Sequence, residues 1–128
     1  MGEETVTTHA RQIKKTNSTS LQQKLDTLST LAAQNEIQPF VQAFVPLDLT
    51  PEEITSFVHD LTQAEESDSQ WENLKVEIMT IASGEKVTKI EELEEGNRIV
   101  FYFEHPVYEG CDREVAFVCT KGEWRAEG

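Results

Sequence analysis

The sequence predicts a single α+β domain in which three N-terminal helices pack on a curved, cone-like antiparallel sheet of four to five strands. Apolar residues recur at helical spacing over residues 20–64, and from Trp71 onward they alternate at a period of two. Short turns separate the later apolar runs, which is typical of hairpin-connected strands. The chain has 128 residues, of which 38% are apolar, enough for one hydrophobic core. We expect residues 20–128 to form this domain and residues 1–19 to be a disordered polar tail.

Caps and prolines delimit the first two predicted helices. Ser18 or Ser20 can cap a first helix that runs to about Gln34, since leucines recur there at helical spacing. Pro39 falls in the first turn of a short second helix, where proline is tolerated. Pro46 ends that helix, because the residue before a proline is disfavoured in the helical region.

The third predicted helix has the clearest local signal in the chain. Thr50 is placed to be its N-cap, Pro51 takes the first helical position, and Glu53 completes a capping box. Acidic residues in this first turn also complement the positive end of the helix dipole. Apolar residues then recur at helical spacing, and we expect the helix to end near residue 63 or 64.

The strand expected at the centre of the sheet is the run Arg98–His105, the densest stretch of β-branched and aromatic residues. Phe101 and Phe103 lie on one face of this strand and Tyr102 on the other, so both faces need cover. Further strands are expected where apolar residues alternate between turn residues. These strands are residues 74–82, 86–93, 114–120 and 123–126.

The chain is acidic, with a formal net charge of −13 and an isoelectric point near 4.5. This charge argues against nucleic-acid binding, which requires clustered lysine and arginine. The acidic residues either form a solvated surface or present a face to a basic partner. No apolar run could span a bilayer and no signal-peptide pattern is present, so we expect a soluble, cytoplasmic protein. A trimmed exported protein or lipoprotein would also begin with Met1, Gly2 and a polar stretch.

The two cysteines, Cys111 and Cys119, are expected to be reduced thiols. On one continuous strand they would lie about 25 Å apart, which is too far for a disulfide bond. Neither belongs to a Cys-x-x-Cys or Cys/His pattern, so the sequence predicts no metal site and no cofactor.

Three stretches carry a resemblance to a known superfamily. Gln34–Pro46 has the pattern of a short second helix, Trp71–Ile78 that of a strand entering a sheet, and Glu114–Arg125 that of a closing hairpin with a Gly-x-Trp motif. Together, over residues 21–127, they resemble the nuclear-transport-factor-2-like (NTF2-like), or cystatin-like, superfamily, in particular its small bacterial members of unknown function, often lipoproteins. The resemblance implies a helix-lidded concave sheet, which serves relatives as a ligand pocket, an active site or a dimer interface. The extra strand that larger members have between the second and third helices has no counterpart here, unless residues 40–45 supply it.

The candidate site residues lie on the face that such a concave sheet would enclose. His105 ends the central strand on the same face as Phe101 and Phe103, which places it at the mouth of a cavity on that face. The same aromatic side chains are those that a small core needs, and this simpler interpretation stays open. His59, beside Asp60 on the third helix, is either a general base or a surface histidine. The full set of pocket candidates is Phe40, Phe44, Trp71, Phe101, Phe103 and His105.

These observations favour a non-enzymatic binding domain that uses the concave sheet for a small apolar ligand or a protein partner, including a second copy of itself in a homodimer. Enzymes of the superfamily use an acidic base with a tyrosine or histidine partner. One alternative is therefore an isomerase or dehydratase with a carboxylate–histidine pair in the cone. A second alternative is an acidic inhibitor or immunity-type protein that binds a basic partner. No residue lies in a recognisable motif of the superfamily's enzymes, so the sequence assigns no catalytic residue.

Overall fold

A computed structural model describes residues 13–62, 67–106, 108 and 110–127 of the chain, with only the backbone for residues 67–69. Within this part, four α-helices precede a four-stranded antiparallel sheet of order β1-β2-β3-β4. The helices are α2 (Thr19–Ala33), α3 (Ile37–Phe44), α4 (Pro51–Thr62) and α5 (Ser67–Ser83). The strands are β1 (Val87–Leu93), β2 (Arg98–Glu104), β3 (Asp112–Thr120) and β4 (Glu123–Ala126), with a short 3₁₀ turn, η1 (Glu94–Gly96), between the first two.

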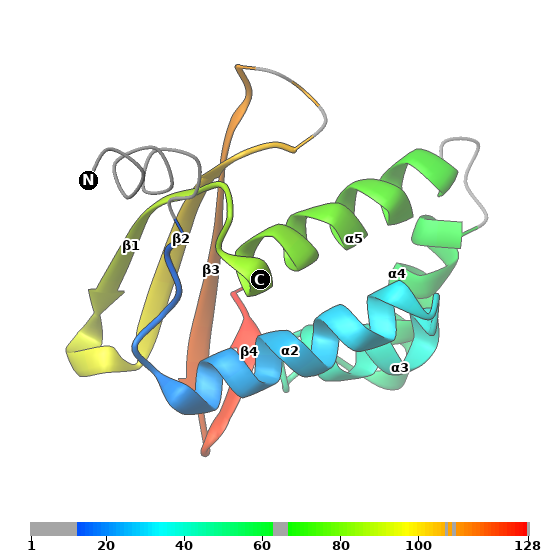
Figure 1. Cartoon of the computed structure of the whole chain (residues 1–128). Helices are drawn as coiled ribbons and strands as arrows, with labels where there is room; N and C mark the ends of the chain where they lie inside the picture. The colour runs from blue at the N-terminus through cyan, green and yellow to red at the C-terminus, as the bar shows by residue number, and fades with distance from the viewer. Residues whose placement is uncertain (1–12, 63–66, 107, 109, 128) are drawn as a thin grey trace, which may run out of the picture.

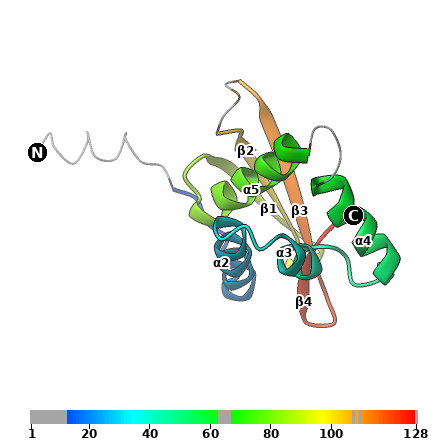
Figure 2. The same ribbon diagram turned by 90° about the vertical axis from the view of Figure 1, so that its right-hand side faces the viewer.

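The predicted α+β class is confirmed, with the helices gathered on one side of the sheet (Figures 1 and 2). Helices α2 and α3 contact β4, and α5 contacts β2, whereas α4 packs on α3 and α5 behind them. The sheet is open and not strongly curled, so the helices lie on it as a second layer and do not close a cone.

The prediction of a strand over residues 74–82 is wrong, because these residues form the second half of α5. Leu74, Val76 and Ile78 fit a period of two, but a longer helical stripe runs through the same segment. Trp71, Ile78 and Ile81 of that stripe are almost completely buried, as expected for a helix with one face on the core. Within the described residues α5 is consequently a fourth helix, and the sheet begins only at β1.

The predicted N-terminal ends of α2 and α4 are confirmed by their caps. The backbone N–H of Leu21 donates to Ser18 Oγ at 3.2 Å, which makes Ser18 the N-cap of α2. The capping box of α4 is complete, since the N–H of Thr50 donates to Glu53 Oε1 at 2.8 Å. The N–H of Glu53 donates back to Thr50 Oγ1 at 3.1 Å. Both caps are made by residues close in sequence, which is why the sequence predicts them well.

Strand β2 lies between β1 and β3, as its two apolar faces predict. Phe101 pairs with Ile90 of β1 and with Val115 of β3, and its side chain is fully buried beneath the helices. Aromatic contacts join the two layers, for example Phe44 of α3 against Phe117 of β3, with ring centroids 6.1 Å apart. The largest fully buried side chains are Phe40, Phe101, Phe103, Phe117, Leu21, Leu25, Leu28, Ile78, Ile81, Ile99, Val41 and Val45.

Residues 1–12 of the predicted tail lie outside the described residues, and residues 13–18 lead directly into α2. The N–H of Lys14 donates to the carbonyl oxygen of Gly84 at 3.0 Å, and the Thr16 side chain is buried. This short segment therefore packs beside the end of α5.

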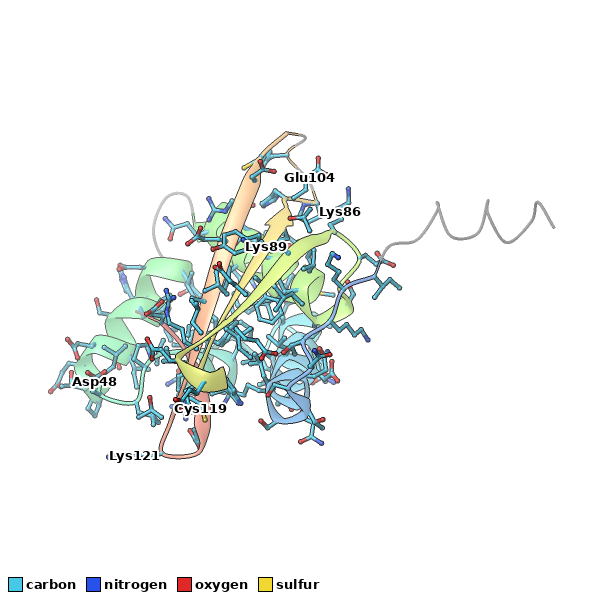
Figure 3. All side chains as sticks on the ribbon, turned by 90° about the vertical axis from the view of Figure 1, so that its left-hand side faces the viewer. Asp48, Lys86, Lys89, Glu104, Cys119 and Lys121 are labelled. Atoms are coloured by element: carbon cyan, nitrogen blue, oxygen red, sulfur yellow. The ribbon has the colours of Figure 1, made fainter. Side chains whose placement is uncertain are left out.

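The face of the sheet opposite the helices, which Figure 3 shows from outside, carries polar side chains that pair with one another. The hydroxyl of Tyr102 donates to Glu91 Oε1 at 2.8 Å, and Arg98 forms an ion pair with Glu127 at 2.7 Å. Val100, between Arg98 and Tyr102 on this face, is nevertheless almost fully buried. Polar pairs that satisfy one another in this way are suited to contact with water.

Replacing Tyr102 with phenylalanine should reduce stability in a defined pH range. The hydrogen bond from Tyr102 lowers the pKa of Glu91, and the same bond raises the pKa of Tyr102. A lowered carboxyl pKa stabilises the fold above about pH 4, and that effect is lost as pH falls through the lowered pKa. A raised phenol pKa stabilises the fold below about pH 10, and that effect is lost as pH rises through the raised pKa.

Urea unfolding of the wild type and Tyr102→Phe across this range should therefore show the largest difference near neutral pH and convergence at both extremes. A difference that stays constant from acid to alkaline pH would mean that the hydrogen bond is not its cause.

Candidate functional site

A polar groove of about 310 Å³ lies between α5 and the segment that leaves β2 and enters β3. Ionisable and hydrogen-bonding side chains from both sides reach this groove, in contrast to the apolar core beneath the helices. Helix α5 supplies Gln70, Asn73, Leu74 and Glu77, and the β2–β3 segment supplies His105, Tyr108, Cys111 and Arg113.

Glu77 is the carboxylate of the groove and is only 7% exposed. Its Oε2 atom lies 3.0 Å from Arg113 Nε and 3.8 Å from His105 Nε2, so one oxygen is close to both basic groups. A carboxylate removed from water is costly unless a cation or hydrogen-bond donors compensate it. Arg113 supplies that compensation from β3, and it links the helix layer to the sheet.

His105 is 3% exposed and is held in a fixed orientation by its own loop. The N–H of Tyr108 donates to His105 Nδ1 at 3.2 Å, so the proton of the neutral ring lies on Nε2, toward Glu77. The backbone N–H of His105 donates to the carbonyl oxygen of Cys111 at 2.8 Å, and the Tyr108 ring lies 4.6 Å from the imidazole. The imidazole therefore connects the β2–β3 segment to α5.

The Arg113 side chain is half exposed, unlike the carboxylate that it contacts. Among the described residues, Glu77 is the one carboxylate that forms an ion pair with it. The contact is made by Nε, at the side of the guanidinium group, and it leaves N–H donors of the terminal nitrogens available to a ligand. One edge of the Arg113 guanidinium group is therefore held by Glu77, and the opposite edge can contact a ligand.

The structure separates His105 from the other predicted pocket residues. His105 lines the groove, whereas the five predicted aromatic residues belong to the hydrophobic core. Trp71 and Phe40 pack edge to face with centroids 5.3 Å apart, and Trp71 Nε1 donates to Asn35 Oδ1 at 3.0 Å. The aromatic residues in the core are Phe40, Phe44, Trp71, Phe101 and Phe103.

Sequence reasoning missed Glu77 and Arg113. Interpreted as part of a strand, Glu77 is an ordinary polar residue between two apolar ones, with its side chain in water. In the helix it lies three residues after Leu74 and four before Ile81, on the stripe that faces the core. A carboxylate on an apolar helical stripe is the signal that could have identified this site.

His59, the second candidate histidine, is a surface residue. The side chains of His59 and Asp60 are 67% and 73% exposed, and their closest atoms are 4.0 Å apart on the surface of α4.

Both cysteines are free thiols, as expected. In the part of the chain that the structure describes, no group of His, Cys, Asp or Glu side chains is arranged to hold a metal ion. None of the helices in that part has the length and apolar character to cross a membrane.

A second cavity, of about 340 Å³, lies beside the β3–β4 turn, where Figure 3 labels Asp48 and Lys121. Its arginine, Arg125, donates to the carbonyl oxygen of Val45 at 3.3 Å and pairs with Glu123 at 2.6 Å. The contact with Val45 binds the end of α3 to β4, and Glu123 of the same strand pairs with the charge, so Arg125 serves the fold. The groove of Glu77, His105 and Arg113 is therefore the stronger candidate for a ligand site.

The fold and the groove define an α+β domain with an open antiparallel sheet, one helical layer and a polar site at the edge between them. Comparisons with protein-family models, with curated proteins and with solved structures found no significant match to this chain. The resemblance to the NTF2-like superfamily stays a prediction.

Proposed function

We propose that the protein is a non-enzymatic binding domain whose ligand site is the polar groove of Glu77, His105 and Arg113. The observation that carries the proposal is the pair of nearly buried ionisable side chains, Glu77 and His105, beside an open cavity. Burying such groups costs stability, and functional sites are where proteins commonly retain them. A concave site with a few convergent polar groups is the usual form of a small-molecule site.

The proposal moves the binding site away from the centre of the sheet. Phe40, Phe101 and Phe103 fill the space between the sheet and the helices, each at most 1% exposed. A small apolar ligand on the inner sheet face would have to displace this core. A second copy of the chain on the outer face would have to cover two polar pairs, Tyr102–Glu91 and Arg98–Glu127, and remove them from water. A small polar ligand in the groove requires neither change.

An enzyme is the second candidate, because His105 and Glu77 form a carboxylate–histidine pair in the same groove. A general base must have a nitrogen within hydrogen-bond reach of the substrate proton. Here Nδ1 accepts from the backbone of Tyr108, and Nε2 is directed toward Glu77. Nδ1 is occupied by the backbone of Tyr108 and Nε2 is buried, so neither nitrogen is exposed to a molecule in the groove, and this arrangement favours binding over proton transfer.

A screen of small polar molecules tests the proposed function. Binding is detected by changes in the amide NMR signals of the protein. Ligands should shift signals of residues around Glu77 and Arg113. Asn73→Trp should abolish these shifts, because position 73 is half-buried in the groove and a large ring would fill it. Met79→Trp is the matched control, since Met79 is exposed on the same helix and does not line the groove.

Ligands that bind the wild type and Met79→Trp but not Asn73→Trp would support the groove as the binding site. If no molecule shifts the groove signals, or if Asn73→Trp binds as well as the control, the proposal is wrong. Chemical conversion of a bound molecule that His105→Gln prevents would favour the enzyme.

A further inference from the structure

We propose that the groove binds the carboxylate or phosphate group of a small molecule, with Arg113 as the anion-binding residue. The inference rests on the proposed function, since it assigns a ligand class to the same groove. Its starting point is the orientation of Arg113, which contacts Glu77 through Nε while half of its side chain is exposed. A guanidinium group held at one edge presents its terminal N–H groups as a fork, and such a fork matches the paired oxygens of a carboxylate or phosphate.

Glu77 acts in this arrangement as a positioning residue for Arg113. Its side chain is 9% exposed, and the arginine contacts its Oε2 atom at 3.0 Å. An arginine that is already oriented loses less conformational freedom when a ligand binds, which favours affinity. Because so little of this side chain is exposed, the carboxylate is largely shielded from solvent.

The remaining polar groups of the lining can donate hydrogen bonds as well as accept them, and the charge of Arg113 is what favours an anion. Gln70 and Asn73 each carry an amide N–H group beside a carbonyl oxygen, and Tyr108 carries a hydroxyl group. Together with Arg113 they offer donors from α5 and from the β2–β3 segment to a group between them. An oxyanion accepts several such hydrogen bonds at once, whereas an ammonium group accepts none. A cationic ligand would also have to displace Arg113 from Glu77.

The net charge of −13 repels an anionic ligand at long range, and this repulsion has to be compared with the attraction of the local contacts. At physiological ionic strength charges more than about 8 Å apart are largely screened. Charge-assisted hydrogen bonds to an arginine fork contribute about 1.5–3 kcal/mol each. Screening therefore makes the distant acidic residues a smaller effect than the contacts in the groove. The nearby carboxylate of Glu77 is already paired with Arg113. The volume of about 310 Å³ limits the ligand to a small molecule.

A matched set of probes can test the charge preference of the groove. Succinate, succinamide and 1,4-diaminobutane have similar lengths and carry negative, neutral and positive ends, and inorganic phosphate is a fourth probe. Each is titrated at constant ionic strength into the isotope-labelled protein, and the groove signals are followed. We expect saturable shifts with succinate or phosphate, and much weaker ones with the other two. The stronger of the two anions identifies whether the groove prefers a carboxylate or a phosphate.

Two variants of equal net charge test the role of Arg113. Arg113→Gln should lower the affinity for the bound anion at least about tenfold, because a charge-assisted hydrogen-bond pair is lost. Arg98→Gln removes the same charge from the outer face of the sheet, where Arg98 pairs with Glu127, and should change the affinity little. Because glutamine at position 113 can still donate to Glu77, we expect the variant to fold, and its amide spectrum verifies this.

The outcomes separate this inference from the function on which it rests. Groove shifts with succinamide or diaminobutane but not with the anions would overturn the anion preference and leave the groove a ligand site. Equal weakening by Arg113→Gln and Arg98→Gln would show a general charge effect and would overturn the role of Arg113. If all four probes leave the groove signals unchanged, the anion inference is wrong, and the wider screen with Asn73→Trp decides the proposed function separately.

Discussion

Phe101→Ala is expected to lower the free energy of unfolding by about 3–5 kcal/mol, the largest loss among the changes considered for this protein. Phe101 is fully buried in the middle of β2, and its ring lies edge to face with Phe117 at a centroid distance of 6.3 Å. The substitution removes apolar contacts to both the sheet and the helices and leaves a cavity between them. A domain of this size has about 5–15 kcal/mol of stability in total, so much of it would be lost.

Urea unfolding followed by tryptophan fluorescence measures this loss, because Trp71 and Trp124 are both buried and report on the core. Phe57→Ala is the matched control, since Phe57 is only partly buried on α4 and should lose much less stability. If the alanine variant does not fold, Phe101→Leu gives a smaller loss in the same direction. A loss below about 1 kcal/mol would mean that Phe101 faces open space, and it would restore the hypothesis of an apolar ligand site on the sheet.

Gly84→Ala is the second change with a large expected effect, because two separate causes add at this position. Gly84 ends α5 with a φ of +79°, a conformation that costs an L-residue about 1–2 kcal/mol. A Cβ atom there would also clash with the carbonyl oxygen of Lys14, a backbone atom that cannot simply rotate away. We therefore expect a loss of more than about 2 kcal/mol, or displacement of residues 13–16 from the end of α5.

Gly122→Ala separates the two causes. Gly122 has the same φ of +79°, but no atom lies within 4 Å of the added Cβ. The difference in unfolding free energy between the two variants measures the contact with Lys14. Tryptic cleavage after Lys14 or Lys15 should also be faster in Gly84→Ala, if the segment is displaced. Equal stability losses with equal cleavage rates would show that residues 13–16 do not pack against Gly84 in solution.

One residue of the groove, His105, could be recognised from the sequence as a candidate. Its place at the end of β2 follows from the alternation along that strand, and the structure confirms that it faces the helices. Glu77 and Arg113 could not be recognised, because they are 36 residues apart in the printed numbering and meet only when α5 packs across the sheet. The aromatic residues illustrate the reverse case. Their periodicity predicts burial correctly, but it cannot distinguish a filled core from a lined pocket.

The sequence by itself determined the features that depend on neighbouring residues. The start of α2 at Ser18 or Ser20, the capping box of Thr50 and Glu53, and the central position of β2 are set by interactions or alternation over a few residues, and the structure selects Ser18 as the cap.

The tertiary structure decided the rest, beginning with residues 67–83. Their apolar side chains fit a strand at a period of two and a helix at 3.6, and packing of Trp71, Ile78 and Ile81 on the core selects the helix. That selection turns Glu77 toward Arg113 and His105 and so creates the groove. Contacts between distant segments depend on how the layers pack, and for that reason local sequence patterns do not contain them.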